Sequence, residues 1–245
     1  AGGSTCSRIQ NATAMPFSLP SFAHFIAAPR RLAVAAALAI LLFAPFTPPA
    51  VADEHLAARP GDRVLGTDHA PIVMIEYYSL DCPFCASFHA ETFPRLKAEY
   101  IDTGKVRFVF RDYPQSWAAL EAAILTHCAP PERFFAVHEA LLKTLGQWSK
   151  AESTIRAVAE VGETQGVSKE TFKACIDARV LERQVFESQK FARDALGVKS
   201  TPTFFLNRER LVGNVPFDKL SLGLDILLDE IARRSGGLTS LETPH

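Results

Sequence analysis

Two cysteines separated by two residues form the pattern in this sequence that is best suited to chemistry. The motif Cys-Pro-Phe-Cys at residues 82–85 follows an apolar run at 72–78 and opens an amphipathic segment at 86–100. This order predicts a strand that leads into a helix beginning at the cysteine pair. The unpaired N–H groups and the positive dipole end of such a helix favour a thiolate at Cys82. We therefore expect redox chemistry of thiols at this pair.

A Cys-x-x-Cys pair alone does not distinguish a redox pair from half of a zinc site or from a chance pair of buried cysteines. A second segment, 120 residues downstream of Cys82, narrows the choice because Pro202 follows Thr201 and immediately precedes a β-type run at 203–206. Proline is tolerated at the first position of a strand, and a cis peptide bond is almost exclusively a property of proline.

Together, the two motifs resemble those of a thioredoxin-fold thiol:disulfide oxidoreductase of the DsbA family, over roughly residues 60–235. The resemblance implies an α/β protein, a thioredoxin fold with an inserted all-helical subdomain. It identifies Cys82 and Cys85 as the redox pair and Thr201-Pro202 as a cis-proline loop. It further implies a monomeric enzyme without cofactor or metal that introduces disulfides into unfolded or reduced secreted proteins, and a DsbB-like membrane oxidase or quinone partner.

The two sulfurs of the motif are expected to have different roles. Cys82, at the helix start, would be the exposed nucleophile of the reduced protein and the sulfur attacked in the oxidised protein, and Cys85 the buried resolving partner. Pro83 and Phe84 complete the redox motif. Strongly oxidising family members commonly carry histidine at the position of Phe84, which offers the thiolate neither a positive charge nor a hydrogen bond. An inert, structural Cys-x-x-Cys disulfide is the alternative.

Glu76 stands inside the apolar run, six residues before Cys82. We expect its carboxyl to be largely buried beneath the motif and to exchange protons with Cys85, since the family carries an acid at this position. The alternative is that strand alternation points Glu76 to a polar edge. His89 shares a helix face with both cysteines, and we interpret it as a surface or capping histidine, with tuning of the thiolate as the alternative.

The loop at Thr201 and Pro202 is the predicted substrate-binding position. Its backbone is expected to pair with an extended substrate peptide by β-augmentation beside Cys82. Because threonine precedes this proline in both isomerases and oxidases of the superfamily, a disulfide isomerase or reductase is the alternative enzyme. The alternative of another class is a periplasmic copper-binding assembly chaperone with Cys82 and Cys85 as ligands.

The other two cysteines of the expected mature chain lie in a region with helical spacing. Cys128 and Cys175 could face each other across a helix pair, and an even number of cysteines in an exported chain favours a structural disulfide. The alternatives are a second redox pair and a metal site that adds His127.

The N-terminal region has the pattern of a secretory signal peptide. Arg30 and Arg31 precede 13 residues without charge or proline, and Ala-Val-Ala follows at 50–52. Such a run is too short to span a bilayer core of about 30 Å. We expect cleavage after Ala52, which removes residues 1–52, and a periplasmic protein. Export by the twin-arginine route is the alternative to the general secretory route.

The rest of the chain, residues 53–245, is expected to form a single thioredoxin-like domain. Strands are predicted at 72–78 and 106–110 and in a final hairpin, with a helical insertion at about 115–188 and a last helix at 217–234. The 26 basic residues are balanced by 27 acidic ones, for a formal net charge of −1. This balance argues against nucleic acid as a partner.

Overall fold

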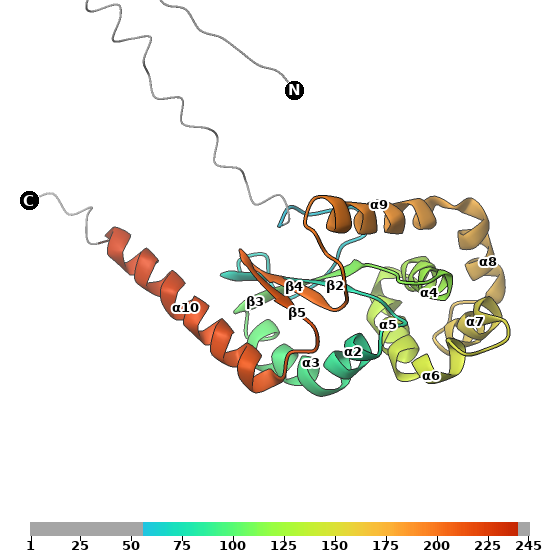
Figure 1. Ribbon diagram of the computed structural model, residues 1–245, viewed down its shortest axis with the longest axis horizontal. Coiled ribbons are helices and arrows are strands. Elements are labelled where there is room, and N and C mark those ends of the chain that lie inside the picture. Colours follow the sequence, from blue (N-terminus) through green and yellow to red (C-terminus); the bar gives the residue numbers. More distant parts are fainter. Residues whose placement is uncertain (1–55, 240–245) are drawn as a thin grey trace, which may run out of the picture. The chain divides into compact units, whose positions relative to one another are not determined.

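A five-stranded mixed sheet forms the centre of the computed structural model, which describes residues 56–239 (Figure 1). The strand order is β1-β3-β2-β4-β5. The strands are β1 (Arg63–Leu65), β2 (Ile72–Tyr78), β3 (Val106–Asp112), β4 (Thr203–Leu206) and β5 (Glu209–Val212). β2 and β3 are parallel, and the other three neighbouring pairs are antiparallel. The predicted signal peptide and its cleavage position after Ala52 lie outside the described residues.

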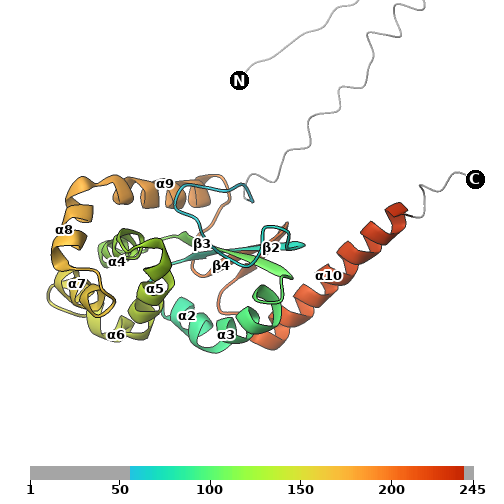
Figure 2. The same ribbon diagram turned by 180° about the vertical axis from the view of Figure 1, so that it is seen from behind.

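Both faces of the sheet are covered by helices, which explains why β2 is a continuous apolar run rather than an alternating one. Side chains alternate along the strand, so Met74, Glu76 and Tyr78 point to one face and Ile75 and Tyr77 to the other. On the first face lie α2, α3 and α10, and on the second lies α9, as Figures 1 and 2 show. Glu76 therefore points toward the helices that follow the cysteine motif.

The helix that follows β2 is a composite. Residues 83–101, called here the first helical segment, comprise α2 (Pro83–Ser87), a π-helical turn (Phe88–Thr92), α3 (Phe93–Leu96) and a second π-helical turn (Lys97–Ile101). Pro94 lacks an N–H and would crowd a carbonyl one turn earlier, so a locally wider turn accommodates it. The segment agrees with the helix expected at 86–100.

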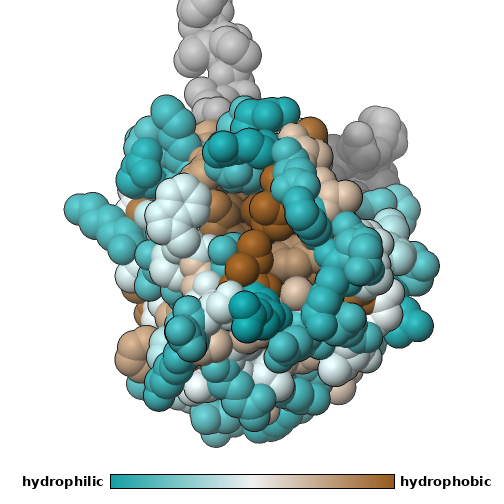
Figure 3. Space-filling view, turned by 90° about the vertical axis from the view of Figure 1, so that its right-hand side faces the viewer, coloured by the Kyte–Doolittle hydropathy of each residue, from teal (hydrophilic) through white to brown (hydrophobic). Residues whose placement is uncertain are grey.

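The chain between β3 and β4 is helical and contains no strand. Its helices are α4 (Trp117–Cys128), α5 (Phe134–Lys143), α6 (Leu145–Trp148), α7 (Thr154–Thr164), α8 (Lys169–Ala178) and α9 (Val180–Asp194), with a short 3-10 turn at Pro131–Arg133. Its outer surface is mostly hydrophilic, with hydrophobic side chains gathered in a central hollow (Figure 3).

A disulfide joins Cys128 of α4 to Cys175 of α8, with their Cα atoms 6.1 Å apart. The pairing expected from the sequence is therefore present.

The insertion is expected to end at about residue 188, a position that lies inside α9. No helix boundary occurs there, since α9 is unbroken from Val180 to Asp194. The break lies earlier, at Arg179, whose φ of 56° ends α8. Val185 and Ala192, seven residues apart, are both buried, so a single uninterrupted helix presents one face to the core.

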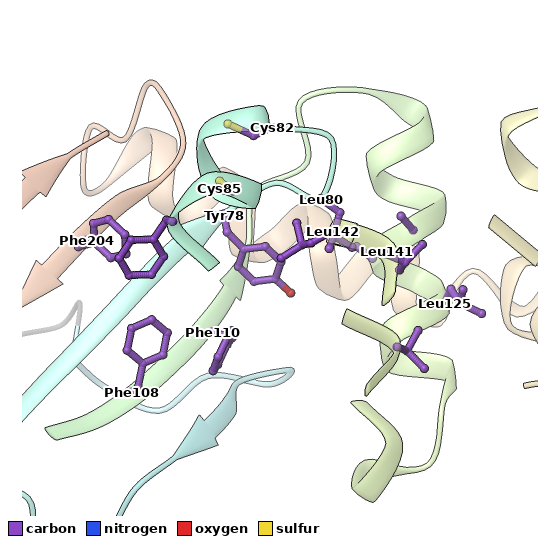
Figure 4. Close-up of a cluster of buried hydrophobic side chains, with 14 of the residues drawn as sticks. Tyr78, Leu80, Cys82, Cys85, Phe108, Phe110, Leu125, Leu141, Leu142 and Phe204 are labelled. Atoms are coloured by element: carbon purple, nitrogen blue, oxygen red, sulfur yellow. The ribbon is translucent and has the colours of Figure 1, made fainter. Parts of the chain in front are cut away.

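One hydrophobic core connects the sheet to the helical insertion. Figure 4 shows Phe108, Phe110 and Phe204 of the sheet, then Tyr78 and Leu80, then Leu125, Leu141 and Leu142 of the insertion. Both cysteines of the motif belong to this buried cluster, at its upper edge in the figure.

The last helix, α10 (Phe217–Thr239), continues five residues beyond its predicted end. Within residues 56–239, no helix combines the length and apolar character that crossing a membrane requires.

Candidate active site

The cysteine motif lies where β2 ends and the first helical segment begins. Cys82 has an extended backbone (φ −87°, ψ 116°) and precedes Pro83, the first helical residue. Proline suits this position because its missing N–H would have no helical partner there. The N–H of Cys82 donates to the Ser79 carbonyl (3.1 Å), which fixes the turn out of the strand. Both cysteines are free thiols, so the structure represents the reduced state.

The solvent exposures of the two cysteines differ less than the sequence predicts. Cys85 is fully buried, as predicted. Cys82, predicted to be exposed, has only 5% of its surface accessible. Its thiol packs against the chain before β4 and donates a hydrogen bond to the Thr201 carbonyl (3.3 Å). This long-range contact, across 119 residues of sequence, explains the low exposure.

The loop before β4 thus lies beside the sulfur. The peptide bond between Thr201 and Pro202 is cis. The Thr201 hydroxyl accepts a hydrogen bond from Gln115 Nε2 (2.8 Å), and the Gln115 N–H donates to Ser79 Oγ (3.1 Å). Gln115 therefore connects the loop before β4 to the turn that carries Cys82. Sequence reasoning missed this residue because nothing in its local pattern distinguishes it from a surface glutamine.

The surroundings of Cys82 favour its thiolate. Hydrogen bonding from the Cys85 thiol, together with the Thr201 side chain and the backbone N–H groups of Cys85 and Phe84, lowers the pKa of Cys82 from 9.0 to about 6. Partial burial opposes this effect and is outweighed. The two N–H donors belong to the first turn of the helix, as the motif predicted, whereas Thr201 lies on the loop before β4. At neutral pH, Cys82 is therefore mostly ionised.

The surroundings of Cys85 have the opposite effect. Burial raises the pKa of the Cys85 thiol well above its ordinary value, and the hydrogen bond that it donates to Cys82 and the charge of Glu76 raise it further. The motif thus combines a thiolate at Cys82 with a protonated thiol at Cys85. Such a pair has one sulfur ready to attack or leave and one that holds its proton.

Glu76 is fully buried on the face of the sheet beneath the motif, which agrees with the sequence prediction of its position. Its Oε2 atom lies 2.8 Å from His89 Nε2, and its Oε1 atom has no hydrogen-bond partner. The interpretation of His89 as a surface or capping residue is wrong, because only 9% of its side chain is exposed. A buried carboxylate needs a partner, and that requirement would have singled out His89 on the helix face shared with the cysteines.

Two aromatic side chains are exposed on the elements that surround the motif. Phe84 is 64% exposed and Trp117, the first residue of α4, is 70% exposed. Asp81 connects the turn before Cys82 to the start of α4, since it accepts hydrogen bonds from Ser79 Oγ (2.5 Å) and from Ser116 Oγ (2.6 Å), which precedes α4. No group of three or more His, Cys, Asp or Glu in the described part of the chain is arranged to hold a metal ion.

The pKa of Cys82 gives a direct prediction for alkylation of the reduced protein. Because the thiolate is the reactive form, the rate of Cys82 alkylation by iodoacetamide should rise with pH to a midpoint near 6. Mass spectrometry of the alkylated peptides checks this, and Cys85 should stay unmodified throughout. A midpoint near that of an ordinary thiol, about 8.5, would contradict the expected stabilisation of the thiolate.

The same pKa shift links folding to pH. A thiol whose pKa is lower in the folded state stabilises the fold above its unfolded pKa and loses that contribution as pH falls through the folded value. The free energy of unfolding of the reduced protein, relative to that of the Cys82→Ala variant, should therefore decline between about pH 8.5 and pH 6.

Comparison with known proteins agrees with the fold and the motif. A family model described as Thioredoxin matches residues 58–225. The chain belongs to the thioredoxin family. Its fold is similar to that of the crystal structure of Wolbachia pipientis alpha-DsbA1, with a TM-score of 0.68 and 29% identity over 74% of this chain and 98% of that chain. The predicted resemblance to DsbA and the predicted thioredoxin fold are thereby confirmed.

Two curated relatives carry related names. A Rickettsia felis protein named "Putative protein-disulfide oxidoreductase" is 30% identical over 181 residues, which are 74% of this chain and 65% of that protein. "Disulfide bond formation protein D" of Bacillus subtilis is 25% identical over 166 residues, 65% of this chain and 74% of that protein. The chain thus spans just under two thirds of the length of the rickettsial relative.

Proposed function

We propose that this protein is a dithiol–disulfide oxidoreductase of the DsbA type, which introduces disulfides into secreted proteins through Cys82 and Cys85. The observation that carries the proposal is the asymmetry of the pair. The pKa of Cys82 is lowered to about 6 by donors at a helix start, while burial raises the pKa of Cys85. An inert structural pair has no need of a stabilised thiolate.

In the oxidised protein, a substrate thiolate attacks the Cys82 sulfur. The bond between the two protein sulfurs breaks, a mixed disulfide forms at Cys82, and Cys85 leaves as a thiolate that takes up a proton. The second substrate thiolate then attacks the substrate sulfur of the mixed disulfide and releases Cys82 as its thiolate. Two electrons pass from the substrate dithiol to the protein.

The stability of the released thiolate supports the oxidising direction. Whatever stabilises the reduced form raises the reduction potential of the pair. The N–H donors and the Cys85 thiol stabilise the Cys82 thiolate without a histidine at position 84. Isomerase or reductase activity is the alternative within the same chemistry, and it differs in the resting redox state of the pair.

Substrate binding is assigned to the backbone beside Cys82. An extended peptide pairs with Thr201 and Pro202 by β-augmentation, which brings its cysteine to the reactive sulfur. The low exposure of Cys82 supports this assignment, because an extended segment with a projecting cysteine reaches a nearly buried sulfur more readily than a folded surface does. Exposed Phe84, two residues after Cys82, offers the peptide an apolar contact.

The cellular context of the proposal comes from the N-terminal pattern. Cleavage of a signal peptide after Ala52 releases a periplasmic domain, residues 53–245, which acts as a monomer on unfolded or reduced secreted proteins. A DsbB-like membrane oxidase or quinone partner reoxidises Cys82 and Cys85, since each turnover leaves them as thiols. The proposed domain contains the whole region, 58–225, that matches the thioredoxin family.

The proposed activity is tested with a reduced, denatured disulfide-containing protein as substrate. The oxidised protein should convert its thiols to disulfides in a stoichiometric reaction, followed by loss of free thiols and by recovery of the substrate's native activity. Cys82→Ser is the matched control and should be inactive. Tight binding of copper by the reduced protein together with no oxidation of substrate would instead support a copper-binding chaperone. Faster reshuffling of scrambled disulfides than oxidation of dithiols would support an isomerase.

A further inference from the structure

A pocket of about 660 Å³ opens between the first helical segment and α5. Its mouth includes Glu139 and Lys143, whose side chains are 64% and 70% exposed. Its lining includes His89 and His138, which are both largely buried. The pocket therefore extends from solvent to two imidazoles in the interior, and it is large enough for several water molecules.

His89 connects this pocket to the carboxyl beneath the redox pair. Its ring lines the pocket and its Nε2 atom lies 2.8 Å from Glu76 Oε2. Glu76 is fully buried, and its charge acts on the Cys85 thiol. The groups thus follow one another in the order Cys85, Glu76, His89, pocket.

The proposed exchange reaction requires a path by which the Cys85 proton reaches solvent. Each time Cys85 attacks a mixed disulfide it loses a proton, and each time it leaves a disulfide it gains one. Cys85 has no exposed surface, so its proton cannot pass directly to bulk water. A buried acid can accept the proton, but a carboxylate that is itself buried must then pass it on before the next turnover.

We propose that His89 is the proton relay between Glu76 and the pocket. The inference rests on the oxidoreductase function proposed above and deepens it. When Cys85 attacks the mixed disulfide at Cys82, its proton passes to Glu76 and from Glu76 to His89 Nε2. The ring releases a proton from its other nitrogen to water in the pocket. The same steps in reverse deliver a proton to Cys85 when it leaves. His89 acts through Glu76 and does not touch the reacting sulfurs.

The side chains around His89 support its role as the path of the proton. On β2 it faces Glu76, and on α5 it faces His138, whose ring centroid lies 4.9 Å away. Burial, with the nearby charges of His89 and His127, lowers the pKa of His138 well below its ordinary value, so His138 stays neutral. Phe93 and Phe110 flank the ring, with centroids at 4.8 and 5.8 Å, and carry no charge.

The other charged groups belong to the outer part of the pocket. They are Glu139 and Lys143 on α5, and Glu91 and Lys97 on the first helical segment that carries His89. Glu139 and Lys143 pair with each other at the mouth, and Lys97 pairs with Asp102. His89 is therefore the titratable side chain that both contacts the Glu76 carboxyl and lines the pocket.

The test uses the reduced protein and an aromatic disulfide that releases a coloured thiolate, mixed in a stopped-flow instrument. The first release reports attack by Cys82. The second release reports attack by Cys85 on the mixed disulfide and therefore includes the loss of the Cys85 proton. His89→Ala should leave the first phase unchanged and slow the second at least about tenfold, within the range of general acid–base effects. Added imidazole should enter the pocket and restore the second phase with saturating concentration dependence.

Three further variants separate relay from structure. His89→Gln can keep a hydrogen bond to Glu76 but cannot relay the proton, so it should be slow and folded. Glu76→Gln should slow the second phase without rescue by imidazole. His69→Ala, which removes an exposed histidine on a loop, should match the unaltered protein. A normal second phase in His89→Ala, or a slow one that imidazole does not restore, would overturn the relay. If the unaltered protein shows neither phase, the proposed oxidoreductase function itself fails.

Discussion

The Cys85→Ser variant is expected to remain covalently joined to its substrates through Cys82, whereas Cys82→Ser is expected to lose exchange activity by at least about 10³-fold. Only the sulfur at the helix start can be reached by another protein, because Cys85 has no exposed surface. Only Cys85 lies in position to attack the mixed disulfide and expel the substrate, since it donates a hydrogen bond to the Cys82 sulfur.

This expectation is checked by non-reducing electrophoresis after the reduced Cys85→Ser variant meets substrate proteins that carry disulfides. Complexes should appear that are sensitive to reductant, and mass spectrometry should locate the link at Cys82. The double variant Cys82→Ser, Cys85→Ser is the matched control and should form none. Absence of trapped complexes in Cys85→Ser, or complexes linked through Cys128 or Cys175, would show that the roles are wrongly assigned.

Removal of the second disulfide is expected to destabilise the protein without stopping exchange. Cys128 and Cys175 are 47 residues apart in sequence and join α4 to α8. Closure of a loop of this length contributes about 4 kcal/mol in the chain-entropy model, so the variant Cys128→Ala, Cys175→Ala should lose about that much free energy of unfolding. Denaturant unfolding of the unaltered protein and of this double variant, both under oxidising conditions, measures the difference in the free energy of unfolding.

The same variant tests whether this disulfide takes part in redox chemistry. A structural disulfide predicts that the rate of dithiol oxidation per folded molecule is unchanged at a temperature well below unfolding. Cys128→Ala and Cys175→Ala singly should resemble the double variant in stability, because either change opens the loop. A normal stability with a large fall in activity would favour a second redox pair that passes electrons to Cys82.

The local parts of the site could be predicted from the sequence. A Cys-x-x-Cys pair between an apolar run and an amphipathic segment gave the strand, the helix start and the thiolate at Cys82, because a helix terminus supplies its donors from neighbouring residues. Pro202 before an apolar run indicated the start of β4 in the same way. The pairing of Cys128 with Cys175 was also predicted, because few cysteines leave few possible partners.

Three features were decided only by the tertiary structure, because each depends on how separate parts of the chain pack. They are the burial of Cys82, the extent of α9 and the contact between Glu76 and His89. Cys82 is nearly buried since the Thr201 carbonyl, 119 residues away, covers its sulfur. α9 runs unbroken through position 188 because its buried face packs on the sheet.

The pairing of Glu76 with His89 shows the same limit most clearly. The apolar run around Glu76 predicts that its carboxyl is buried, and helix periodicity places His89 on the face of the cysteines. Neither pattern fixes how β2 and the first helical segment pack, and therefore neither predicts a contact of 2.8 Å. Because the cost of burying a carboxylate depends on its partner, the sequence determined which residues carry the chemistry, and packing decided how protons reach them.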